Sequence, residues 1–175
     1  KIYRHFKNQM IVLGIHDGHN CGSALFKDGN LICVLSEERV TRNKNEYGFP
    51  IHAINYCLKY ANLKKNQIDQ ISVSTKKLPP KYFLVKRNTS FKIEDYYKEQ
   101  NEYWYKRIYE NKKVKYLDIF KNKKIKKTEL HYDFKKIKNE DDYAGMLNAR
   151  KDHISKFFSL KKSKIFFYDH HECHA

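Results

Sequence analysis

The chain has 175 residues, a net charge of +16 and an apolar fraction of 41%, with 14 Tyr and 11 Phe. This length fits one domain or one lobe of a larger domain, and the apolar content is enough for a packed core. No stretch approaches the roughly 20 consecutive apolar residues of a membrane span, and the first residues lack the apolar region of a signal peptide.

The four cysteines form no CxxC pair and lack the dense spacing of a disulfide framework. This usage is typical of proteins kept in a reducing compartment. We therefore expect a cytoplasmic protein without a membrane partner.

Three short apolar runs near the start of the chain indicate strands, at residues 10–14, 23–26 and 31–35. Asp28-Gly29 lies between the last two runs and is a strong hairpin signal, because Gly adopts the positive φ that the turn requires. We expect an antiparallel meander with the first strand in a central position.

The next segment predicts one helix and one more strand. Residues 37–42 are charged and are expected to form a loop, whereas Pro50 suits the first turn of a helix. Residues 68–75 alternate apolar and polar positions, which indicates a strand. The first 75 residues thus predict the order β-β-β-α-β.

Beyond residue 80 the pattern is looser. We expect a helix over 93–111, whose apolar contacts would be Tyr96, Tyr97, Trp104 and Ile108. Residues 121–127 form a basic run that predicts a loop or an exposed helix end. A helix over 141–158 follows an acidic start, and 165–168 indicates the last strand.

The positive charge is concentrated in residues 76–127, which contain 17 basic and 6 acidic residues, a net charge of +11. One interpretation is a solvated insert of biased composition. The other is a patch that binds RNA or another polyanion, with Trp104 and nearby tyrosines stacking on bases. Those aromatic residues could equally pack against the protein.

The first candidate site is the segment from Gly14 to Ala24. Its small residues let backbone amides approach a phosphate or another anion, and the expected contacts are Gly18, Asn20, Gly22 and Ser23. Asp17 and His19 could share general-base work. A Gly-rich turn with an incidental histidine is the alternative.

The second candidate site is the histidine cluster at residues 170–174. His170 and His174 are four residues apart, so a helix beginning there would place both imidazoles on one face. Two such imidazoles can bind a divalent metal. The alternative is a group of structural or surface histidines, with Cys173 as a ligand or only a spacer.

Glu38 and Arg39 form the third candidate, within the charged segment that follows the meander. They could contact a substrate, or they could belong to an exposed charged corner.

Taken in order, these segments resemble the N-terminal part of the O-carbamoyltransferases of nodulation-factor and antibiotic biosynthesis. The resemblance covers residues 10–75 and 165–175, whereas residues 76–164 match only loosely, as a variable basic helical insert would. The matching motifs are Asp17-Gly18-His19, Gly22-Ser23-Ala24, Lys27-Asp28-Gly29, Glu37-Glu38-Arg39, Gly48-Phe49-Pro50 and the His-His-x-x-His-Ala of residues 170–175.

This resemblance implies an α/β fold with a mixed five-stranded sheet and flanking helices. The lobe would be related to sugar kinases and actin, and close to tRNA threonylcarbamoyl transferases. It also implies transfer of a carbamoyl group from carbamoyl-adenylate to a hydroxyl group of a small metabolite, with glycosylated acceptors included. ATP and carbamoyl phosphate would be co-substrates.

The resemblance further implies roles for individual residues. His170 and His174 would bind a divalent, iron-like metal at the end of the last strand. Asp17 and His19 would act on the acceptor hydroxyl, and the metal would bind the nucleotide or polarise the carbamoyl carbonyl.

Family members are several times longer, so we expect residues 1–175 to be the N-terminal lobe alone, without the C-terminal domain that makes carbamoyl-adenylate. Such a lobe would be inactive by itself. Two alternatives remain: a non-catalytic basic module that binds RNA or another polyanion, and a tRNA-modifying relative.

Overall fold

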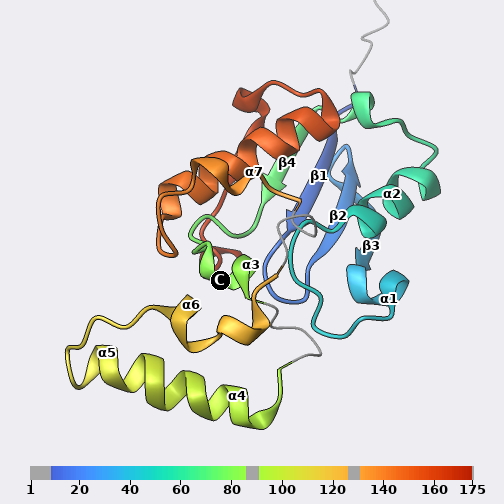
Figure 1. Ribbon diagram of the computed structural model, residues 1–175. Helices are drawn as coiled ribbons and strands as arrows, with labels where there is room; N and C mark the ends of the chain where they lie inside the picture. Colours follow the sequence, from blue (N-terminus) through green and yellow to red (C-terminus); the bar gives the residue numbers. More distant parts are fainter. Residues whose placement is uncertain (1–8, 86–90, 126–130, 175) are drawn as a thin grey trace, which may run out of the picture.

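The computed structural model describes residues 9–85, 91–125 and 131–174, and a mixed five-stranded sheet lies at its centre (Figure 1). The strand order is β3-β2-β1-β4-β5, so β1 is central as predicted. The strands are β1 Ile11–His16, β2 Gly22–Lys27, β3 Asn30–Ser36, β4 Gln70–Val73 and β5 Ile165–Phe167.

The sheet joins an antiparallel half to a parallel half. β1 pairs antiparallel with β2, and β2 with β3, which confirms the predicted meander. β1 pairs parallel with β4, and β4 with β5. The carboxyl ends of β1, β4 and β5 consequently meet at one edge of the sheet.

One face of the sheet is covered by α2 (Ile51–Tyr60) and α7 (Tyr143–Phe158) (Figure 1). Alternate strand residues such as Leu13 and Ile71 point into this core, since successive side chains of a strand face opposite sides. Ile54 of α2 joins them there. Both helices lie where the sequence predicts them.

The charged segment after β3 is helical, which corrects the predicted loop. Residues Glu37–Thr41 form α1, and Glu37 is buried. Its carboxylate accepts hydrogen bonds from the backbone N–H of His52 (3.0 Å) and of Ala53 (2.7 Å). Glu37 thus satisfies free N–H groups in the first turn of α2, a stabilising role for a carboxylate.

The segment between β4 and α7 contains several short helices besides its longer one. They are α3 Lys81–Leu84, α4 Ile93–Lys98, the π-helix η2 Glu99–Tyr105, α5 Lys106–Ile108 and α6 Tyr116–Ile119. The described residues also form short 3-10 helices: η1 Lys65–Gln67, η3 Lys121–Lys123, η5 Phe134–Lys136, η6 Lys162–Lys164 and η7 Glu172–His174. The predicted basic run at 121–127 begins in η3, and its last two residues lie outside the described ones.

These middle helices build a second, smaller apolar cluster, and α4 and α5 lie apart from the sheet (Figure 1). Its buried residues are Val85, Phe91, Tyr103, Tyr116 and Phe120. Of the contacts expected from the sequence, Trp104 packs against this cluster, whereas Tyr96, Tyr97 and Ile108 are exposed. The π-helix η2 changes the helical periodicity, so Tyr103 faces inward instead.

Lys81 connects the two clusters. Its side chain is buried, and its ammonium donates hydrogen bonds to the hydroxyl of Tyr103 (2.7 Å) and to the carboxylate of Asp141 (2.5 Å). Because Asp141 directly precedes the α7 cap residue Asp142, this contact joins the middle segment to the main core.

A fully buried ion pair joins α7 to the end of β1. Arg150 of α7 and Asp17 are both fully buried, and the guanidinium donates from Nε (2.7 Å) and Nη2 (2.6 Å) to the two carboxylate oxygens. The hydroxyl of Tyr132 donates to the same carboxylate at 2.6 Å. Such a bidentate arrangement is the strongest form of an Arg–carboxylate pair.

Within the described residues, no helix combines the length and apolar character that a membrane crossing requires.

Replacing Arg150 with Ala is expected to destabilise the fold strongly, because the carboxylate of Asp17 would stay buried without a cation. Removing one partner of a buried pair costs about 3–5 kcal/mol. The matched control is Lys44→Ala, which removes the exposed pair of Lys44 and Glu38 and should cost about 0–1 kcal/mol. Urea unfolding followed by circular dichroism measures both; equal losses would contradict the prediction.

Candidate active site

The edge where the three parallel strands end contains a cavity of about 520 Å³. Open α/β sheets commonly bind ligands beyond the carboxyl ends of their strands. The lining residues follow three different strands: His16, His19 and Asn20 at the end of β1, Ser74 and Thr75 after β4, and His170 and Cys173 after β5.

A second hollow of about 410 Å³ adjoins this cavity and shares four of its residues. It extends over the sheet face opposite to the core, where Gly14, Ala24 and Ser72 lie side by side on neighbouring strands. The small side chains leave this part of the surface open. The predicted contacts Asn20, Gly22 and Ser23 line the hollow.

The side chain of His16 makes three hydrogen bonds at the cavity, and no pattern in the sequence distinguished this residue. Its Nε2 lies 2.9 Å from the backbone carbonyl of His19, which can only accept, so Nε2 carries the proton. Nδ1 then accepts from the hydroxyls of Ser74 (2.9 Å) and Thr75 (3.1 Å). Burial lowers the pKa of His16, which favours this neutral form.

The loop after β1 is shaped closely around His16. A Cβ atom at Gly18 would lie 3.0 Å from the imidazole, so this glycine permits a close backbone approach. Asn20 adopts a positive φ of 57°. His19 itself is exposed at the wall of the cavity, and its backbone forms a bridge with Tyr47.

Asp17 and His19 lie on different sides of this loop. Both carboxylate oxygens of Asp17 are bound by Arg150 and Tyr132 beneath α7, whereas His19 faces the cavity. Asp17 therefore anchors the loop from below. Neither Arg150 nor Tyr132 had a signal in the sequence, since both come from the segment that matches the family only loosely.

The other predicted contacts lie away from the cavity. Glu38 pairs with Lys44 at 3.4 Å and accepts from the backbone N–H of Asn45, which lowers the pKa of Glu38. Arg39 is exposed on α1. Neither residue lines the cavity or the adjoining hollow.

The histidine cluster reaches the cavity through His170, whose ring stacks on His16 with centroids 5.5 Å apart. The chain turns after β5, and the N–H of Cys173 in η7 donates to the carbonyls of Asp169 and His170. The α-helix that would place His170 and His174 on one face is not formed, because this segment is a turn followed by a short 3-10 helix. The side chain of His174 lies outside the described residues. Within the described part, no group of three or more His, Cys, Asp or Glu residues could hold a metal.

The cavity therefore combines exposed and neutral imidazoles, two hydroxyl groups and an amide, contributed by three strand ends. Such a set can orient a hydroxyl group and accept its proton. The sheet order and the short loops after each strand determine this arrangement.

Among known proteins, an uncharacterised protein from Methanocaldococcus jannaschii is 43% identical over 63 residues, or 36% of this chain and 12% of that protein. An uncharacterised protein from Synechocystis is 42% identical over 53 residues, which are 30% of this chain and 9% of that protein. Nodulation protein NolNO from Sinorhizobium fredii is 38% identical over 58 residues, which are 33% of this chain and 8% of that protein. The matched segments thus cover 12% or less of each of these relatives.

A family model described as "Carbamoyltransferase N-terminus" matches residues 11–175, which includes every strand of the sheet and all residues that line the cavity. The chain therefore belongs to the carbamoyltransferase N-terminus family.

Proposed function

We propose that this chain forms the acceptor-side lobe of an O-carbamoyltransferase, which transfers a carbamoyl group from carbamoyl-adenylate to a hydroxyl group of a small metabolite. The family supports the reaction type. The small hydroxylated acceptor, with glycosylated compounds included, is part of the proposal and follows from the resemblance to the O-carbamoyltransferases. Carbamoyl phosphate and ATP would be the co-substrates, and another domain would make the adenylate.

The observation that carries the proposal is that His19 and His170 line the same cavity. These two residues are 151 positions apart in the sequence, and both are exposed at the wall of the cavity. The mixed five-stranded sheet supports a lobe related to sugar kinases and actin.

His19 is proposed to act as the general base. It would accept the proton of the acceptor hydroxyl while the oxygen attacks the carbamoyl carbon and adenylate leaves. The imidazole of His16 donates a hydrogen bond to the backbone carbonyl of His19, and the contact of Asp17 with Arg150 fixes the other side of the same loop. These two contacts position the imidazole of His19. Asp17 is thus a positioning residue in this mechanism.

His170 and His174 would hold a divalent metal, whose role when bound is to polarise the carbamoyl carbonyl or bind the nucleotide. The donor set suits a metal of the iron or zinc class, since neutral imidazoles are its common ligands. The hydrogen bond from Cys173 N–H to the Asp169 carbonyl (3.3 Å) forms one helical turn in this segment. This turn spans residues 169–173, and the 3-10 helix η7 that follows begins only at Glu172, so the two imidazoles would be brought to one metal by side-chain orientation and not by an α-helical face.

The metal assignment is tested on the double variant His170→Ala with His174→Ala. We expect it to lose stoichiometric binding of ferrous iron or zinc, measured by titration calorimetry and elemental analysis. His171→Ala is the matched control, because it removes the neighbouring imidazole of the same turn and should leave binding intact. Stoichiometric metal in the double variant would disprove the assignment.

The transfer reaction is tested with the polypeptide as its gene encodes it, supplied with ATP and isotopically labelled carbamoyl phosphate. His19→Gln should reduce labelling of hydroxylated acceptors by about 10²–10⁴-fold, the usual contribution of a general base. Lys59→Gln, on the exposed side of α2, should have no effect. Full activity of His19→Gln would exclude the proposed base.

A second candidate function is polyanion binding by the middle segment, and one observation favours it. Tyr105 and Tyr109 flank α5, both are exposed, and their ring centroids lie 5.1 Å apart. Lys113 and Lys115 line a hollow near this helix. Exposed aromatic rings beside cations are typical of single-strand binders.

This candidate predicts RNA binding that weakens steeply with salt, because phosphate contacts release counterions. Fluorescence anisotropy of a labelled single-stranded RNA at increasing salt measures it, with Tyr105→Ala and Tyr109→Ala expected to weaken binding. Salt-independent or absent binding would remove the candidate, whereas the transfer assay above is independent of it.

A further inference from the structure

The sheet face opposite to the main core is apolar and largely exposed. On this face one row of paired residues crosses all five strands, in the order Val34, Ala24, Gly14, Ser72 and Phe166. Paired residues of neighbouring strands point to the same side of a sheet. Val34 is 65% exposed and Phe166 is 41% exposed. Both ends of the row therefore place a large apolar side chain in solvent.

The centre of this row is a trough. Its floor is formed by the small residues Gly14, Ala24 and Ser72, which line the hollow of about 410 Å³. Val34 and Phe166 stand on the two outer strands, four strand spacings apart, which corresponds to about 19 Å. An α-helix with its side chains is about 10–12 Å wide. The trough thus has room for one helix that lies along the strands.

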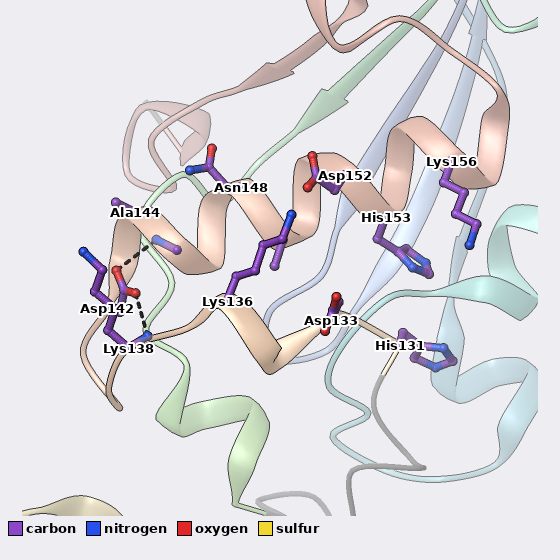
Figure 2. A pocket seen from close by; sticks show the side chains of 12 residues that line it. His131, Asp133, Lys136, Lys138, Asp142, Ala144, Asn148, Asp152, His153 and Lys156 are labelled. Atoms are coloured by element: carbon purple, nitrogen blue, oxygen red, sulfur yellow. Dashed lines mark hydrogen bonds between the residues drawn. The ribbon is translucent and has the colours of Figure 1, made fainter.

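Parallel strands are normally covered by helices on both faces. β1, β4 and β5 form the parallel half of this sheet. α2 and α7 cover the core face, and the pocket beside α7 is lined mainly by charged and polar side chains (Figure 2). In the described part of the chain, the hollow on the other face is lined by strand and loop residues and by Cys173 of η7.

The chemistry of the hollow indicates an apolar partner. The chain has a net charge of +16, yet none of the residues that line the hollow is Lys, Arg, Asp or Glu. Contiguous apolar surface of this kind marks a contact with another part of a protein or with another molecule. Close approach over small residues favours the packing of a helix, because its side chains can fill the space above the floor.

We propose that this face binds an amphipathic α-helix from the same polypeptide, contributed by sequence outside residues 1–175 and seated between Val34 and Phe166. The relatives have ample further chain, since the matched segments are 12% or less of each. The hollow shares His16 and Asn20 with the cavity, so one end of the helix would border the candidate active site. The proposal goes beyond the transfer reaction and does not depend on it.

The occupant is identified by photocrosslinking of the polypeptide as its gene encodes it. The photoreactive residue p-benzoylphenylalanine replaces Phe166, and mass spectrometry identifies the peptide to which it links. We expect a link to a peptide outside residues 1–175 of the same molecule. The control places the same residue at Tyr60, an aromatic position of α2 that is 66% exposed, and should give no link to that peptide.

Three results of this experiment would overturn the proposal. A crosslinked dimer on a denaturing gel would show that a second copy covers the face. Links only within residues 1–175, or no link at all, would show that no further helix lies there. The transfer assay of His19→Gln is read separately, so failure of one proposal leaves the other testable.

The small floor is tested by Ser72→Leu in the same polypeptide. A larger side chain beneath a packed helix causes overpacking, so the melting temperature should fall by about 2 °C or more. Lys59→Leu adds the same side chain on the exposed side of α2 and should leave the melting temperature unchanged. Equal melting temperatures of the two variants would show that nothing packs on the floor and would overturn the proposal.

Discussion

Asp17 and Arg150 form an ion pair with no exposure to solvent, and much of the molecule is arranged around it. Two charges can be removed from water only when their geometry and hydrogen bonds are nearly complete. Here the guanidinium binds both oxygens and the hydroxyl of Tyr132 adds a third contact. The pair therefore fixes α7 and the 131–138 segment against the end of β1.

This anchor separates two surfaces. On one side lies the loop that carries His19 at the cavity, and on the other lies a pocket between α7 and the 131–138 segment. Neither surface includes the carboxylate itself. A buried charge pair thus lies between the proposed catalytic site and a second pocket.

The sequence predicted the sheet well because its signals are local. The apolar runs and Asp28-Gly29 specify the meander, and periodicity specifies α2 and α7. The prediction of a loop at residues 37–42 was wrong. The carboxylate of Glu37 binds the backbone N–H groups of His52 and Ala53, and the sequence gives no local sign of this contact. Tyr103 was missed because a π-helix does not follow the usual helical spacing.

The candidate site was predicted only in part. The motifs located His19, Asn20 and His170 at the cavity, since each lies in the short loop that follows a strand. His16 was overlooked because it is the last residue of a strand, where its partners Ser74 and Thr75 are visible only in three dimensions. Pairing of Asp17 with Arg150 spans 133 positions, and no local pattern can indicate such a contact.

The contact of Lys81 with Tyr103 and Asp141 has a consequence for cooperativity. Among the described residues, the main core has 19 buried apolar residues, whereas the smaller cluster has five. Local opening costs the least where the fewest apolar contacts must be broken. The smaller cluster is therefore expected to open at a lower free-energy cost than the main core, and the contacts of Lys81 couple it to that core together with the N–H groups of Tyr116 and Leu117, which bind Glu140.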